Sequence, residues 1–258
     1  MTVHRADATA LTDVGDLVRH WRQRRRLSQQ ALSDQCGVST RHLSYIETGK
    51  ARPSPTMVGQ LSEALSVPLR ERRRLFTAAG FVPDTTELPL DAPALVEVNE
   101  ALEQILAGHE PYPALVIDGG WDLVTANEAA YRLLADVPPD LLEPPVNVVR
   151  LSLDPRGLAP RIANLGEWRS AIMSRIRHEH DTTGDPRLAA LLADFPVLGP
   201  HATPGIVLTL RLRAGEDVLT FLTTTTVFGT PGDVTVAELA IEALYPADAA
   251  TRALLGTV

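Results

Sequence analysis

One short stretch of the chain, GVSTRHLSYIETGKARPSP over residues 37–55, contains several side chains that can bind anions or form hydrogen bonds with the edge of a planar base. Arg41 and Tyr45 stand one helical turn apart, and Lys50 and Arg52 follow within the same stretch. An arginine fork can donate to two acceptor atoms on the edge of a guanine, and lysine or arginine neutralises phosphate. The spacing therefore favours non-covalent recognition of a polyanion.

The same stretch predicts a short helix between tight turns. Ser39 suits the N-cap, and Val38 before it and Leu43 four residues after it form the pair of a hydrophobic staple. Gly49 is placed to end the helix. In this phase Leu43 and Ile46 face inward. The outward positions are Thr40, Arg41, Ser44 and Tyr45.

Five short helices are expected to hold this stretch within residues 1–83. DVGDLVRHWRQRRR has apolar residues at helical intervals, and Ser28 suits the N-cap of QQALSDQC. Two further helices are predicted at TMVGQLSEAL and LRERRRLFTAAG. The second helix, the turn at Gly37 and the third helix make a helix-turn-helix, whose third helix is presented so that it can enter a major groove.

The charge of the chain is divided unevenly. Residues 1–83 carry 13 Lys+Arg and 7 Asp+Glu, whereas residues 84–258 carry 11 and 25. The division indicates two domains with different partners, of which the basic one suits a polyanion. No run approaches the roughly 18 apolar residues of a membrane span. With one cysteine and no secretory block at the start, we expect a cytoplasmic protein without a membrane partner.

Residues 84–92 read as a linker, and residues 93–258 as a second domain of mixed structure. A helix is expected at 93–107, then a hairpin in PALVIDGGWDLVTAN and a short helix capped by Asn127. GEWRSAIMSRIRHEH and DPRLAALLADF predict amphipathic helices. GIVLTLRLR, with Ile206 and Leu208 on one side, and DVLTFLTTTTVFGTP predict strands. VTVAELAIEALYP fits a helix or a strand, and its period does not decide.

Signals for enzyme chemistry are weak. The chain has no nucleophile elbow, phosphate loop or dinucleotide fingerprint, so we expect no enzyme. His178, Glu179 and His180 have the residue types of a metal site, but the two histidines, two residues apart on a helix, point in different directions. A solvated helix face is the preferred interpretation, and we predict no metal and no cofactor.

The segment LSQQALSDQCGVSTRHLSYIETGK resembles the Cro/lambda-repressor (XRE) class of helix-turn-helix proteins. The resemblance implies binding to double-stranded DNA as a homodimer. It places base or backbone contacts at Gln29, Ser39, Thr40, Arg41, Ser44, Tyr45, Lys50 and Arg52. It also implies an ion pair between Arg22 and Glu47. Many members carry glutamines in the reading helix, so the operator is not transferable. A helical bundle that binds protein is the alternative.

The chain as a whole is similar to the MmyB-like transcription regulators, through motifs such as TTTTVFGTPGDV and YPADAATRALL. This resemblance implies an α+β protein whose second domain is PAS-like, with an antiparallel sheet packed on helices and AELAIEALY as its last strand. It also implies a small apolar, fatty-acyl-like ligand, although a domain that only dimerises or binds a protein partner is the alternative. Aromatic candidates for the pocket, or for ordinary core, are Trp121, Tyr131, Trp168, Phe221, Phe228 and Tyr245.

Overall fold

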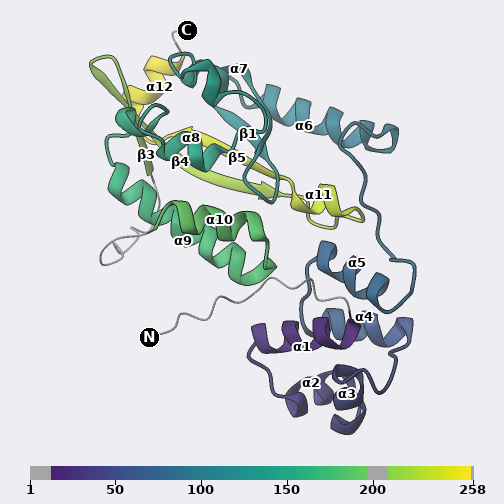
Figure 1. Ribbon diagram of the computed structural model, residues 1–258. Coiled ribbons are helices and arrows are strands. Elements are labelled where there is room, and N and C mark those ends of the chain that lie inside the picture. Colours follow the sequence, from purple (N-terminus) through teal and green to yellow (C-terminus); the bar gives the residue numbers. More distant parts are fainter. Residues whose placement is uncertain (1–12, 197–208, 257–258) are drawn as a thin grey trace, which may run out of the picture. The chain divides into compact units, whose positions relative to one another are not determined.

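The computed structural model describes residues 13–196 and 209–256 (Figure 1). These described residues divide after Glu87 into two compact units. The boundary between the units falls inside the predicted linker 84–92. Ile206 and Leu208, predicted to belong to a strand, lie outside the described residues.

From residue 13 onward the first unit contains five helices, as predicted: α1 (Val14–Arg24), α2 (Gln29–Cys36), α3 (Thr40–Glu47), α4 (Pro55–Ala64) and α5 (Leu69–Ala78). Four of them begin at a side-chain cap, in which Asp13, Ser28, Ser39 or Ser54 accepts a hydrogen bond from a backbone N–H of the first turn. The helices share one core, of which Trp21 is the largest fully buried side chain.

On each side of the boundary between Glu87 and Leu88, the chain makes hydrogen bonds and ion pairs with the unit to which it belongs. In the first unit Asp84 pairs with Arg72, and Glu87 pairs with Arg70. In the second unit the Leu88 N–H donates to Asp233 Oδ2 at 3.1 Å, and the Thr235 hydroxyl donates to the Leu88 carbonyl at 2.6 Å. The connection is therefore anchored by side chains at both of its ends.

A five-stranded sheet organises the second unit, in the order β2-β1-β5-β4-β3. All neighbouring strands are antiparallel, which confirms the predicted α+β class. The predicted hairpin is β1 paired with β2, and the threonine-rich run is β4. The strands are β1 (Ala114–Ile117), β2 (Leu123–Ala126), β3 (Thr209–Ala214), β4 (Asp217–Val227) and β5 (Ala240–Pro246).

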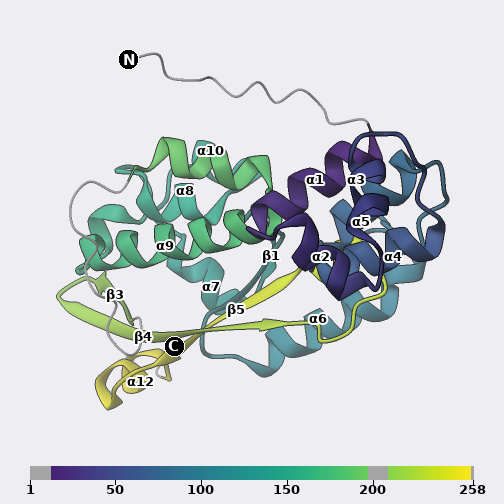
Figure 2. The ribbon, with the colours of Figure 1, turned by 90° about the horizontal axis from the view of Figure 1, so that it is seen from below.

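Helices cover both faces of this sheet (Figure 2). On one face α6 (Val96–Gly108), which follows a 3₁₀ turn at Pro93–Leu95, packs Leu102 and Leu106 against Val116 and Ile241. On the other face lie α8 (Val148–Leu153), α9 (Leu165–Thr183) and α10 (Pro186–Asp194). The remaining helices are α7 (Glu128–Leu133), α11 (Val234–Glu238) and α12 (Ala249–Leu255), with 3₁₀ turns at Pro139–Leu141 and Ala159–Arg161.

The expectation that AELAIEALY is a strand throughout was wrong at its start. Ala237 and Glu238 belong to α11, and the strand begins at Ala240. Asp233 accounts for the helical turn, because its carboxylate accepts the N–H groups of Thr235 and Val236 at 2.8 and 3.4 Å. Local capping therefore sets the start of β5.

Candidate DNA-reading face and ligand cavity

Tight turns and two buried side chains fix the orientation of α3. Leu43 and Ile46 are completely buried. Gly37 and Gly49, which bracket the helix, have φ of 66° and 70°, in the left-handed region that favours glycine. The opposite face of α3 is left exposed or half-buried.

That outer face carries a stacked group of polar side chains. Arg41 Nε donates to the Tyr45 hydroxyl at 3.0 Å, and the guanidinium lies 5.3 Å from the Tyr45 ring centroid. Lys50 Nζ lies 5.9 Å from the same centroid. In the part of the chain that the structure describes, neither cation pairs with a carboxylate. Their charge is available to a ligand.

Other predicted contact residues use their side chains within the unit. Thr40 Oγ1 donates to Gln30 Oε1 at 2.7 Å, and Arg52 Nε donates to the Ala79 carbonyl at 3.0 Å. Gln29 Nε2 donates to Glu47 Oε2 at 2.8 Å. Ser39 accepts from the His42 N–H, and Ser44 is half-buried on α3.

The contact expected between Arg22 and Glu47 is present and bidentate. Arg22 Nε and Nη2 donate to the two oxygens of Glu47 at 2.6 and 2.9 Å, and the Glu47 side chain is fully buried. Arg19 donates to the Glu47 carbonyl. Burial alone would raise the pKa of Glu47, but the hydrogen bonds from Arg22 and Gln29 outweigh it and lower that pKa. This buried carboxylate therefore ties α1, α2 and α3 together.

In the second unit, a cavity of about 160 Å³ lies between the sheet and the helices α7, α8 and α9. Most of its lining is apolar, including Leu115, Leu133, Leu151 and Ile172. Its polar lining groups are Ser152, Arg175, Thr223, Glu242 and the two indoles Trp121 and Trp168. The sequence analysis had not singled out Arg175 or Glu242.

Of the six aromatic candidates, Trp121 and Trp168 line this cavity. Tyr131 borders a different surface pocket, next to Leu142. Phe221 is completely buried in the core, and Phe228 packs against the cluster around α6. Tyr245 packs edge-on against His109, with ring centroids 4.7 Å apart.

Two of the lining residues, Arg175 and Glu242, belong to an ionic group that also contains Glu179. Arg175 Nε donates to Glu179 Oε1 at 2.8 Å, and its Nη2 donates to Glu242 Oε1 at 2.7 Å. Trp121 Nε1 donates to the other oxygen of Glu179 at 2.7 Å, and Thr225 donates to Glu242 at 2.9 Å. Burial would lower the pKa of Arg175, but the two glutamates raise it. Glu179 is thus bonded and half-buried, so the solvated interpretation was wrong for this residue, whereas His178 beside it is exposed as expected.

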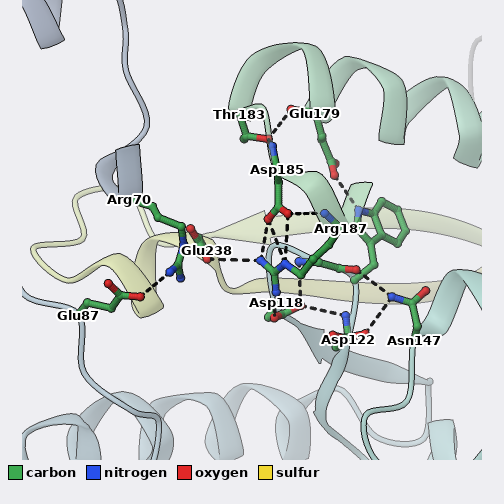
Figure 3. Close-up of polar contacts among 12 residues, drawn as sticks. Arg70, Glu87, Asp118, Asp122, Asn147, Glu179, Thr183, Asp185, Arg187 and Glu238 are labelled. Atoms are coloured by element: carbon green, nitrogen blue, oxygen red, sulfur yellow. Dashed lines mark hydrogen bonds and ion pairs between the residues drawn. The ribbon is translucent and has the colours of Figure 1, made fainter. Parts of the chain in front are cut away.

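Trp121 stands in a strained turn next to this ionic group. Its φ is 67°, which a bulky residue adopts only when its surroundings hold it there. The adjacent Asp118 carboxylate accepts the N–H groups of Gly120 and Asp122 at 2.8 and 2.9 Å. Figure 3 shows Arg187 from α10 reaching Asp118, and the two pair at 2.7 Å. Several contacts therefore preorganise the Trp121 side of the cavity.

The two cavity residues that the sequence did not reveal, Arg175 and Glu242, are brought together only by long-range packing. Arg175 and Glu242 come from a helix and a strand that are far apart in the chain. Glu242 was visible only as a charged residue in an alternating strand, and Arg175 as one of several arginines on an amphipathic helix. Neither signal distinguishes a cavity residue from a solvated one.

A helix-turn-helix with an exposed basic face, joined to a domain that encloses an apolar cavity, defines a DNA-binding regulator with a ligand-binding domain. Residues 98–257 match the family model of the MmyB-like transcription regulator ligand binding domain, and residues 13–75 match a helix-turn-helix domain. The chain belongs to the MmyB-like transcription regulators, a family of regulators and not of enzymes. A comparison with curated proteins found no match. No helix among the described residues is long and apolar enough to cross a membrane.

Proposed function

We propose that this regulator binds a specific operator as a homodimer, through the outer face of α3, and that a small apolar, fatty-acyl-like ligand in the cavity modulates binding. On the DNA side, the proposal is supported by Arg41 and Lys50, whose charges are unpaired within the described residues, and by Tyr45 beside them. The ligand-binding half of the proposal rests on the apolar cavity, which is lined on one side by the polar pair Arg175 and Glu242.

Base contacts are assigned to Arg41 and Tyr45, with Ser44 beside them. Phosphate contacts are assigned to Lys50, to Ser39 at the helix start and to the backbone N–H of Gln29 at the start of α2. Thr40 and Arg52 support the unit from within, because their side chains bond to Gln30 and Ala79. Arg52 is nevertheless exposed, and only its Nε is used in the bond to Ala79.

A cavity-filling substitution tests the ligand. Ala171 lines the cavity on α9, whereas Ala190 is exposed on α10. In Ala171→Leu the added side chain should occupy the ligand volume, and Ala190→Leu is the matched control. Small molecules extracted from each purified protein are identified by mass spectrometry. Binding to an operator selected from random DNA is measured by fluorescence anisotropy.

We expect an apolar molecule to co-purify with the wild type and with Ala190→Leu but not with Ala171→Leu. Adding that molecule should change the operator affinity of the first two proteins several-fold and leave Ala171→Leu unaffected. If all three proteins are free of ligand and bind the operator equally, the second domain does not work through this cavity. Dimerisation or a protein partner would then be its role.

A further inference from the structure

The turn between α1 and α2 holds an arginine in a backbone conformation that favours glycine. Arg26 has φ of 56°, in the left-handed region, where a side chain crowds the following carbonyl oxygen. The Arg26 N–H donates to the Gln23 carbonyl at 2.9 Å. The next N–H, that of Leu27, donates to the Arg22 carbonyl at 3.0 Å. These two bonds make up the Schellman motif, in which the left-handed residue is usually glycine.

Every other described helix of the first unit ends in the same pair of bonds, and most of these ends use glycine. The glycines at the left-handed position have φ between 66° and 75°, and they are Gly37, Gly49 and Gly80. The end of α4, with Ser66 at φ of 45°, is the exception. Glycine would relieve the strain at residue 26, so the turn itself gives no reason for an arginine there.

The Arg26 side chain makes no polar contact within the described residues that would offset this strain. It is exposed, and its guanidinium has no hydrogen bond, ion pair or ring contact with any described residue. By contrast, Arg25 Nε donates to the Leu65 carbonyl at 2.8 Å. Arg24 lies 5.9 Å from the centroid of the Trp21 ring. Arg26 thus presents an unpaired positive charge beside two other cations, and this charge attracts an anion from outside the unit.

The position of Arg26 indicates which anion this is. Arg26 lies two residues before the cap Ser28 and three before Gln29, whose backbone N–H is assigned to a phosphate above. In a helix-turn-helix, the helix that precedes the reading helix crosses the DNA backbone. A turn residue at this end of α2 therefore meets phosphates rather than base edges, and the arginine fork suits a phosphate.

We propose that Arg26 binds a phosphate of the DNA, and that the first unit gives up stability at this turn in return for DNA affinity. This inference rests on the proposed function, because it adds one phosphate contact to the same DNA-binding face. The contact is independent of sequence, since phosphate carries no base information. Removing the side chain should therefore have opposite effects on stability and on DNA binding.

Arg26→Gly tests both effects in the full-length protein. Hydrogen exchange followed by mass spectrometry should show the core amides of the first unit exchanging about two- to tenfold more slowly, because the left-handed strain is relieved. Fluorescence anisotropy should show the affinities for a selected operator and for random DNA both falling by about three- to tenfold at low salt. The slope of log affinity against log salt should decrease by about one.

Two further variants serve as controls. Ser66→Gly is the matched control for strain, because Ser66 occupies the same position of the same motif at the end of α4. It should slow exchange in the first unit to a similar extent and leave DNA binding unchanged. Arg26→Lys keeps the positive charge, so it should retain the salt slope and most of the affinity of the wild type.

The outcomes separate this inference from the proposed function. If Arg26→Gly binds both DNAs as the wild type does, while Lys50→Ala weakens both, Arg26 is no phosphate contact and the proposed function stands. If Arg26→Gly weakens operator binding alone, the assignment of Arg26 to a phosphate is wrong. Weaker DNA binding without slower exchange would overturn the exchange of stability for affinity. If the wild type binds neither operator nor random DNA, both the inference and the proposed function are wrong.

Discussion

At the scale of single residues, Glu47 determines how the reading helix is held. A buried carboxylate is tolerated only when it is bonded, and Glu47 is bonded by Arg22 and Gln29 from the two preceding helices. The sequence resemblance implied the arginine partner. The glutamine partner could not be foreseen, because Gln29 also suits a phosphate contact and only the packed structure decides which group its side chain meets.

Removing the carboxylate should destabilise the first unit strongly. Glu47→Ala leaves Arg22 without its partner in a poorly solvated place, and we expect a loss of about 3–5 kcal/mol in the free energy of unfolding. Glu63→Ala on the exposed face of α4 is the control, with an expected change within about 0.5 kcal/mol. Urea unfolding monitored by circular dichroism measures both variants. Equal losses would mean that the Glu47 contacts contribute nothing specific.

The same residue predicts a loss of stability in acid. The folded state lowers the pKa of Glu47 below its ordinary value of 4.5, so its contribution is complete above about pH 4.5 and disappears as the pH falls through the lower folded value. His20, whose pKa is lowered by burial, adds a separate decline that begins near pH 6.5. Glu47→Gln should remove the lower decline and keep the upper one. Unfolding curves at closely spaced pH values separate the two declines in the free energy of unfolding. If the decline below about pH 4.5 were the same in Glu47→Gln as in the wild type, Glu47 would not be its cause.

At the scale of elements, the contact between α1 and α3 depends on the small size of Gly15. A Cβ at this position would lie 2.3 Å from the Ile46 carbonyl oxygen, a backbone atom that cannot move aside alone. The close approach sets the crossing of α1 with the end of the reading helix.

Gly15→Ala should therefore force α1 and α3 apart, lowering both the unfolding free energy and the operator affinity. Gly59→Ala is the matched control within α4, where a Cβ has only Arg72 Nη2 nearby, at 4.0 Å. There the better helix propensity of alanine should stabilise the unit by up to about 1 kcal/mol. Thermal unfolding and DNA titration of the two variants check this. A stabilised Gly15→Ala with unaltered DNA binding would show that the helices have more room than the structure indicates.

Elements with strong local signals were predictable from the sequence. Serine caps at Ser28 and Ser39 and the turn at Gly37 located α2 and α3, apolar spacing located α1, and the β-branched, threonine-rich composition located β4. The start of β5 was missed because the family resemblance, which decided between helix and strand for this segment, did not take account of the helix cap at Asp233. In the hairpin between β1 and β2 the left-handed residue is Trp121 rather than Gly119 or Gly120, which tertiary packing decides and local propensity does not.

At the scale of the whole molecule, the cations of the first unit differ in whether a carboxylate neutralises them. Arg70 and Arg72 of α5 pair with Glu87 and Asp84, while Arg41 and Lys50 have no such partners among the described residues. Arg41 and Lys50 therefore keep their charge without a carboxylate partner on α3 and in the turn that follows it, where the groove of DNA is expected.

A homodimer should protect two half-sites on DNA. One helix-turn-helix gives little specificity alone, and symmetric binding places the two reading helices about 34 Å apart, one helical turn of DNA. Footprinting on a selected operator, combined with the mass of the complex from light scattering, checks this expectation. One protected half-site with one protomer bound would contradict it.

Base reading by α3 is tested most directly by comparing specific and random DNA for two single variants. Arg41→Ala should weaken operator binding by about 1–3 kcal/mol, relax the preference at one or two base pairs, and change binding to random DNA much less. Lys50→Ala should weaken both DNAs alike and reduce the slope of affinity against salt by about one. If Arg41→Ala weakened operator and random DNA to the same extent, α3 would not read bases through Arg41.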